Sequence, residues 1–186
     1  MSINFTARFL CNAPVLKSSS NTGYQRADLS LVELDNKDTS DMEALKETSD
    51  IWTKMGAKYA RSIYFEATND IYLESVDKEH YFAVTEQKSD FSNLVPDQIL
   101  GLMVFDETNY NSNEITLLEV KPNMTRKNKK DRIYKNVGSN LVNYVQKNFN
   151  PKNIIVFSDE DAIEFYKKNG FKNMYDNSDC QLYWEA

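Results

Sequence analysis

Side chains that can do chemistry lie in three stretches of the second half of the chain. Glu114 and Glu119 lie in NEITLLEVKP, Tyr166 lies in DAIEFYKKNGF, and a basic stretch lies between the two. A semi-exposed carboxylate can act as a general base through a water, and a phenol can donate a proton. An idle surface carboxylate and a tyrosine packed beside Phe165 are the structural alternatives.

The basic stretch, residues 121–135, holds seven lysines or arginines and one acid, Asp131, a local charge of +6. The whole chain carries −6, so the remainder carries −12. This asymmetry predicts an anion held by one basic loop, although a solvated loop would explain the charge run alone. Nucleic acid is not expected as a partner, because a basic footprint confined to one loop is small against an acidic background.

The elements that must position these residues follow from apolar periodicity and turn formers. Strands are predicted at residues 27–35, 80–86, 98–107, 113–122, 153–159, 171–176 and 180–186. Helices are predicted at residues 39–52, 57–67, 137–149 and 161–170. The order β-α-α-β-β-β-α-β-α-β-β predicts an α/β fold with a mixed sheet and helices on both faces. Residues 1–26, polar and turn-rich, are expected as a loosely attached arm, and residues 27–186 as a single domain.

Length and composition limit the classes of protein to which the chain can belong. A chain of 186 residues suffices for one domain with a sizeable core. No apolar run approaches the roughly 18 to 20 residues of a membrane span, and no signal peptide is expected. Cys11 and Cys180 are too few for a disulfide framework or a zinc site, which fits a reducing cytoplasm. A single histidine, His80, makes a hydrolytic triad improbable.

Three stretches, together with the element order, resemble the Gcn5-related N-acetyltransferase (GNAT) superfamily. IIVFSDEDAIEFYKKNGF resembles the last core strand and following helix of that family. NEITLLEVKP resembles its fourth strand with the exit at Val120 and Pro122, and NVGSNLVNYV resembles its phosphate-loop-to-helix junction at Gly138. The matching part covers residues 99–171.

The resemblance implies direct transfer of an acetyl group from acetyl-CoA, or a related acyl-CoA, to a primary amine of a small molecule or protein. It implies Glu114 as the base and Tyr166 as the acid that protonates the departing thiolate. Adjacent helical residues point about 100° apart, and of the pair Phe165 is expected in the core. Glu119 is a second candidate base on the opposite face of the strand, unless a bulge shifts it. Many members of the superfamily need no dedicated base.

The cofactor is expected along one strand edge and one helix N-terminus. Amides and the positive dipole end of a helix suit a pyrophosphate, with Gly138 allowing close approach. The alternative is that Gly138 only packs against a strand. The predicted cofactor-binding residues are Leu118, Val120, Arg132, Lys135, Asn136, Val137, Gly138, Ser139 and Asp159.

The chain departs from the family in its phosphate loop. Ile133 and Asn136 replace an arginine or glutamine and a glycine, and Asp159 stands where many members carry asparagine. The basic stretch TRKNKKDR is expected to compensate for a poorer amide cradle. The alternative function is a non-catalytic or regulatory module that binds acyl-CoA or protein on a degenerate GNAT fold.

The sequence leaves the acceptor amine and the oligomeric state open. The acidic predicted helix at residues 39–52 would steer a cationic amine, or would be a plain solvated helix. Pairing of sheet edges through the final strands is a route to a homodimer.

Overall fold

The computed structural model describes residues 6–19, 23–69, 78–108, 112–125, 132–149, 152–175 and 178–186. The described strands form one mixed sheet of nine strands, in the order β6-β1-β2-β3-β4-β5-β7-β9-β8. All neighbouring strands pair antiparallel except β5 and β7, which are parallel. The predicted mixed α/β sheet is therefore confirmed.

The elements follow the predicted order, with one strand added at the start and one short strand inserted. The strands are β1 (Arg8–Ser19), β2 (Gly23–Leu34), β3 (Lys78–Thr85), β4 (Ile99–Glu107), β5 (Asn113–Val120), β6 (Tyr134–Lys135), β7 (Asn153–Phe157), β8 (Lys172–Tyr175) and β9 (Ser178–Glu185). The α-helices are α1 (Thr39–Lys54), α2 (Ala60–Asn69), α3 (Val137–Asn148) and α4 (Ile163–Lys168). Short 3₁₀ turns lie at Pro96–Gln98, Pro122–Met124 and Glu160–Ala162.

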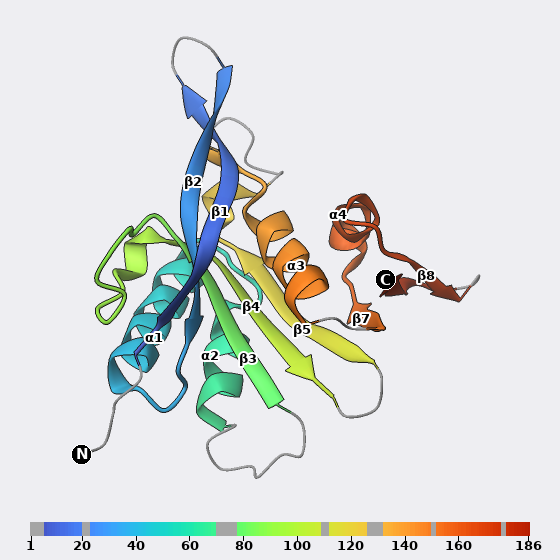
Figure 1. Ribbon diagram of the computed structural model, residues 1–186, viewed down its shortest axis with the longest axis horizontal. Coiled ribbons are helices and arrows are strands. Elements are labelled where there is room, and N and C mark those ends of the chain that lie inside the picture. The colour runs from blue at the N-terminus through green and yellow to red at the C-terminus, as the bar shows by residue number, and fades with distance from the viewer. Residues whose placement is uncertain are drawn as a thin grey trace.

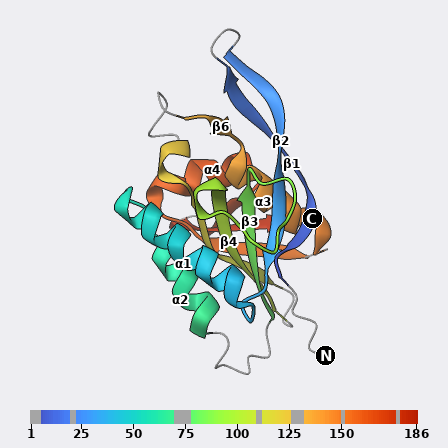
Figure 2. The same cartoon turned by 90° about the vertical axis from the view of Figure 1, so that its left-hand side faces the viewer.

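Helices cover both faces of the sheet (Figures 1 and 2). Trp52 of α1 and Ile63 of α2 are buried against one face, in a cluster with Val104 of β4. Leu141 of α3 and Tyr166 of α4 belong to a second cluster on the other face. The three longer helices, α1, α2 and α3, each bury residues at helical spacing along one side, and this side determines which face of the sheet the helix covers.

The expectation of a loosely attached N-terminal arm is wrong for residues 8–19. These residues form β1, which pairs with β2 from Arg8 opposite Glu33 to Ser19 opposite Gly23. Ala13 and Val15 are buried. The two-residue alternation of this strand is hidden in the sequence, because apolar residues such as Phe9 and Leu16 also point outward. The far end of the strand extends beyond the main sheet (Figure 1). Residues 1–5 and 20–22 lie outside the described part.

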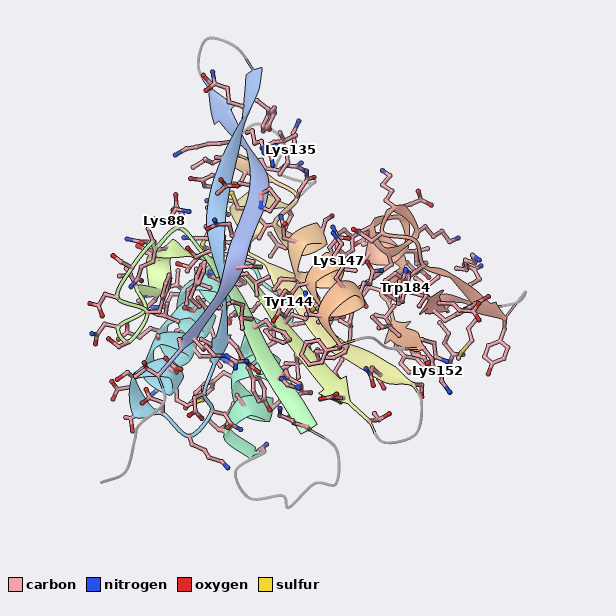
Figure 3. All side chains as sticks on the ribbon, in the orientation of Figure 1. Lys88, Lys135, Tyr144, Lys147, Lys152 and Trp184 are labelled. Carbon is pink, nitrogen blue, oxygen red and sulfur yellow. The ribbon has the colours of Figure 1, made fainter. Side chains whose placement is uncertain are left out.

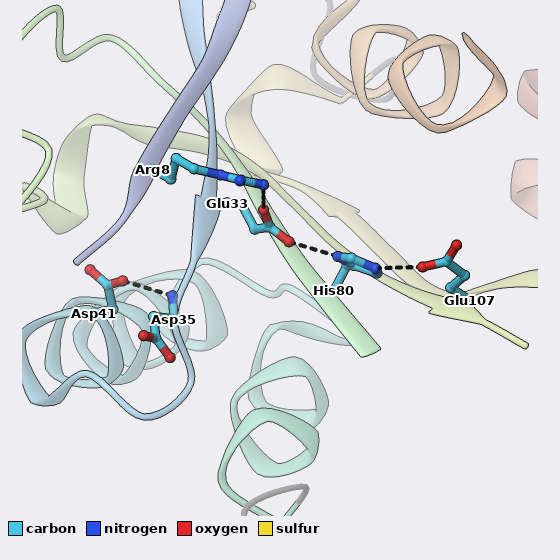
Figure 4. A network of polar contacts seen from close by, with 6 residues as sticks. All are labelled: Arg8, Glu33, Asp35, Asp41, His80 and Glu107. Carbon is cyan, nitrogen blue, oxygen red and sulfur yellow. Dashed lines mark hydrogen bonds and ion pairs between the residues drawn. The ribbon is translucent and has the colours of Figure 1, made fainter. Parts of the chain in front are cut away.

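The only histidine has a structural environment at one end of the sheet. The His80 ring is 4% exposed, and its Nδ1 lies 2.6 Å from a carboxylate oxygen of Glu33. Its Nε2 lies 3.4 Å from Glu107, and Arg8 pairs with Glu33 (Figure 4). These contacts join β1, β2, β3 and β4, so His80 holds strands together.

A buried carboxylate, Asp41, fixes the start of α1 against the end of β2. Its Oδ2 accepts the Asp35 N–H at 2.8 Å (Figure 4), and Asp38 caps the helix through the N–H groups of Ser40 and Asp41. Burial raises the pKa of the Asp41 carboxyl to about 6, with Asp38 and Asp35 adding to the shift. The native protein therefore favours the protonated form of Asp41 over a window in which the unfolded chain ionises.

Asp41→Asn is expected to change how stability depends on pH. The wild-type protein gains stability from protonated Asp41 below pH 4 and loses it as the pH rises to about 6. We expect the free energy of unfolding of the wild type to fall by about 3 kcal/mol relative to the variant across that window. Urea denaturation between pH 4 and 7 measures this, with the exposed Glu47→Gln as the charge-matched control. Parallel pH curves for the wild type and the Asp41 variant would contradict the expectation.

Within the described residues, no helix combines the length and apolar character that a bilayer span needs.

Candidate active site

The sheet divides where its two parallel strands part. β5 pairs with β7 only from Asn113 opposite Ile154 to Ile115 opposite Val156. Beyond that point β5 continues along β4 as far as Val120. Where parallel strands diverge, the backbone N–H and C=O groups along their facing edges do not pair with each other, so a ligand can form hydrogen bonds with them.

A cleft of about 1130 Å³ lies at this divergence. It is lined by the end of β5, the start of α3, the start of α4, β6 and the α1–α2 connection, with Tyr24 of β2 at its edge. The lining includes all nine predicted cofactor-binding residues and Glu119: Leu118, Glu119, Val120, Arg132, Lys135, Asn136, Val137, Gly138, Ser139 and Asp159. Residues brought together from three separate stretches thus share one cleft.

The N-terminus of α3 opens onto this cleft. The first amides of a helix have no partner within the helix, and the dipole makes this end positive, so the arrangement suits a phosphate group. Asn136, the residue before the helix, has the left-handed backbone (φ 70°, ψ 14°) that glycine adopts most easily. The departure from the family's glycine is therefore compatible with the same turn, since asparagine tolerates this conformation.

Asn136→Ala and Asn136→Gly are expected to differ in stability. Alanine in the left-handed region costs about 1 kcal/mol of unfolding free energy, whereas glycine carries no such penalty. The Asn136→Gly variant should therefore match the wild type within a few tenths of a kcal/mol. Urea denaturation checks this, with the exposed helix position Asn143→Ala as the control. Equal stability of the alanine and glycine variants would contradict the expectation.

Gly138 packs closely on two cleft walls. A Cβ added there would lie 3.2 Å from Cζ of Phe165 in α4 and 3.3 Å from Cγ2 of Val120 in β5. Gly138 is also buried and lines the cleft. The packing that was the alternative interpretation of Gly138 is therefore confirmed, and its role at a pyrophosphate stays a prediction.

The basic end of the cleft is built partly by the β1–β2 hairpin. Lys135 of β6 pairs with β1 opposite Leu16, and its Nζ lies 3.3 Å from the centroid of the Tyr24 ring (Figure 3). The Tyr24 hydroxyl donates to the carbonyl oxygen of Arg132. Sequence reasoning missed Tyr24, because it placed residues 1–26 in an arm. Residues 126–131, the centre of the basic loop, lie outside the described part.

A bridge of polar contacts joins the α1–α2 connection to the segment after β7. The ammonium of Lys58 lies 2.7 Å from Asp159 Oδ2, and the Tyr59 hydroxyl donates to the same carboxylate oxygen. Glu119 accepts the backbone N–H groups of both Lys58, at 3.1 Å, and Tyr59. No sequence pattern singles out Lys58 or Tyr59 as site residues, because their partners lie 60 or more residues away.

Glu119 lies on the same face of the sheet as Glu114. The β4–β5 register shifts where Leu117 opposes Val104 and Ile115 opposes Phe105, so one residue of β5 is extra. Such a bulge moves every later side chain to the other face. Without the bulge, the alternation of side chains along β5 would put the two glutamates on opposite faces. The sequence prediction allowed for a bulge that shifts Glu119, and the structure has one.

Glu114 does not line the cleft; it lies towards α2 near other acids. Burial raises the pKa of the Glu114 carboxyl. On α2, burial together with the nearby charges of Glu79, Asp106 and Glu114 raises the pKa of Glu66 to about 7. The carboxylates on this face therefore hold protons closer to neutral pH than an exposed acid does.

The two adjacent aromatic residues of α4 do not have the environments predicted for them. Phe165 is half-buried and lines the cleft, whereas Tyr166 is 5% exposed and packs on Phe171, with ring centroids 5.4 Å apart. Phe165 as the core residue is thus wrong. Burial raises the pKa of the Tyr166 phenol, and Asp159 and Tyr59 raise it further, which places the hydroxyl near the bridge.

The fold and site define a class of protein: a mixed sheet that splits between two parallel strands, with a helix N-terminus at the split. Comparison with models of protein families and with curated sequences found no match. Solved structures are similar to the chain. An acetyltransferase of the GNAT family from Staphylococcus aureus Mu50 has a TM-score of 0.54 and 16% identity, covering 84% of this chain and 98% of that one.

Two further solved structures extend this finding. PaiA N-acetyltransferase from Thermoplasma acidophilum, in complex with coenzyme A, has a TM-score of 0.52 and 19% identity over 86% of this chain and all of that one. A spermidine N-acetyltransferase SpeG chimera from Vibrio cholerae and hSSAT has a TM-score of 0.51 and 13% identity, covering 84% of this chain and 95% of that one. The chain has the acyl-CoA N-acyltransferase fold of the GNAT superfamily, as its sequence predicted.

Proposed function

We propose that this protein is an acetyl-CoA-dependent N-acetyltransferase that acts on a primary amine by direct transfer. The observation that carries the proposal is the cleft between β5 and β7 with the N-terminus of α3 opening onto it. The similar structures support this choice of chemistry, since one was solved with coenzyme A and another is a spermidine N-acetyltransferase.

The residues present fit the cofactor. The first amides of α3 and the close packing of Gly138 suit the pyrophosphate, and Arg132 and Lys135 add positive charge at the same end of the cleft. The edge of β5 at Leu118 and Val120 offers backbone groups to the pantetheine arm. A cleft of about 1130 Å³ accommodates a long ligand of this kind.

Bound acetyl-CoA supplies an acetyl group on a thioester, and transfer forms a bond from nitrogen to the acetyl carbon as the carbon–sulfur bond breaks. We assign the residues of this chain to the proton movements. Glu114 accepts the proton of the amine through a water, and burial raises the pKa of its carboxyl, which makes it a stronger base than an exposed glutamate. The Tyr166 hydroxyl donates a proton to the sulfur. Glu119 positions the α1–α2 connection through its two N–H contacts.

Release of free thiol from acetyl-CoA tests the proposal. With a panel of polyamines, amino acids, aminoglycosides and peptides, at least one primary amine should raise thiol release above the rate without acceptor. Background release with every acceptor would contradict the proposal. Calorimetry with acetyl-CoA then separates the alternatives: heat of binding without turnover indicates a non-catalytic acyl-CoA-binding module, and no binding at millimolar cofactor indicates a protein-binding one.

We propose a cytoplasmic location, where the free thiols of Cys11 and Cys180 stay reduced. The exposed edge of the sheet at β8 offers strand pairing with a second copy, so a homodimer is the proposed assembly.

A further inference from the structure

The cleft contains an alkyl ammonium group that belongs to the chain itself. Lys58 lines the cleft, and its Nζ lies 2.7 Å from Asp159 Oδ2 and 4.9 Å from the centroid of the Tyr59 ring. Hydrogen bonding to Asp159 raises the pKa of this ammonium. A carboxylate oxygen, a phenol oxygen and an aromatic face are three groups that recognise a primary ammonium.

These groups lie beside the proposed site of transfer. Asp159 follows β7, and Glu119 on β5 holds the backbone of Lys58 and Tyr59, so Lys58 links the ends of the two strands that part. Asp159 and Tyr59 also act on the pKa of Tyr166, the proposed acid. An amine bound at Asp159 would therefore lie near the residue that protonates the sulfur.

The Lys58 side chain can leave Asp159 without disrupting the contact between Tyr59 and Asp159. Its side chain is 64% exposed, and an exposed ion pair contributes little to stability. The backbone of Lys58 and Tyr59 is held separately by Glu119, so the Tyr59 hydroxyl stays in place when the lysine side chain turns to solvent. Exchange of one ammonium for another then keeps the charge at Asp159 balanced.

We propose that Asp159 and Tyr59 bind the ammonium group of the acceptor, a cationic primary alkylamine, and that Lys58 occupies this position when no acceptor is bound. The inference deepens the proposed function and rests on it. The bound ammonium loses one proton to the base before its nitrogen attacks. Neutral and anionic acceptors are disfavoured, because they cannot replace the ionic contact that Lys58 makes with Asp159.

Binding of n-butylamine in the presence of coenzyme A tests the inference by calorimetry. Lys58→Met removes the competing ammonium, so we expect n-butylamine to bind about fivefold more tightly than in the wild type. Asp159→Asn in the Lys58→Met background should weaken binding by about tenfold or more. Lys54→Met, an exposed lysine at the end of α1, is the matched control and should leave the affinity for the amine as in the wild type.

Two results would overturn the inference: equal affinity for n-butylamine with and without the Asp159 carboxylate, or equal affinity for n-butylamine and the neutral n-butanol. The proposed function is judged separately. Absence of coenzyme A binding and of thiol release with every amine contradicts the function, whereas turnover that is insensitive to Lys58 and Asp159 contradicts only the acceptor site. Far-ultraviolet circular dichroism and thermal melting of each variant establish that it is folded.

Discussion

Replacing Gly138 with valine is expected to raise the dissociation constant for coenzyme A by about 30-fold. The added side chain meets the Phe165 ring and Val120 at contacts of 3.2 to 3.3 Å from its Cβ alone. Overpacking of this kind costs about 1–3 kcal/mol, and the protein relieves it by moving Phe165 into the cleft. Binding of the cofactor must reverse that movement, so the cost appears in the affinity.

A graded series separates this effect from a general loss of stability. Gly138→Ala adds only the Cβ, which its neighbours accommodate with shifts of a few tenths of an ångström, so its effect on affinity should be smaller. Asn143→Val places the same β-branched residue at an exposed position of α3 and controls for helix propensity. Calorimetry gives the dissociation constants, and thermal melting gives stability. An unchanged affinity in a folded Gly138→Val protein would show that α3 does not approach the cofactor.

The predictions from sequence succeeded where local pattern determines structure. Every predicted strand and helix has a counterpart, since each is a run with one clear apolar period. The predicted cofactor-binding residues line one cleft, because most of them lie at the end of β5 or at the start of α3. Gly170 ends α4 with φ 89°, as a glycine at that point indicates.

The errors arose where distant pairing decides. β1 was missed because apolar residues such as Phe9 and Leu16 also point outward, and because its inward residues Ala13 and Val15 find partners in β2 and α3 only after folding. The bulge in β5 depends on the register with β4, which no single strand reveals. The bridge from Lys58 to Asp159 spans 101 residues, so sequence spacing carries no signal of it.

The prediction that Phe165, and not Tyr166, lies in the core was wrong for a related reason. Adjacent helical residues point about 100° apart, so one of the two must face the core. Which one does so depends on where α4 meets α3. Phe165 lies against Gly138, where the missing side chain of α3 makes room for a ring, and Tyr166 then falls into the core beside Phe171. Packing between the helices therefore determines which of the two rings is buried, whereas hydrophobicity alone predicts phenylalanine in the core.

Burial does not remove Tyr166 from the chemistry, and Tyr166→Phe is expected to lower kcat for acetyl transfer by about 100-fold. Burial raises the pKa of the phenol, so Tyr166 carries its proton at neutral pH and presents an O–H donor to a departing thiolate. Phenylalanine preserves the ring contacts with Phe165 and Phe171, at centroid distances of 5.0 and 5.4 Å. The substitution therefore removes the hydroxyl without opening a cavity.

The matched control is Tyr144→Phe. Tyr144 is a partly buried tyrosine of α3 whose phenol pKa burial also raises, and it packs on Phe82 and Phe149 away from the cleft. Steady-state thiol release gives kcat and KM for each variant, and thermal melting gives stability. A fall in kcat confined to Tyr166→Phe, with both proteins folded, identifies the hydroxyl as the acid. Equal kcat values for Tyr166→Phe and the wild type would make Tyr166 a packing residue, and the thiolate would then leave with a proton from solvent.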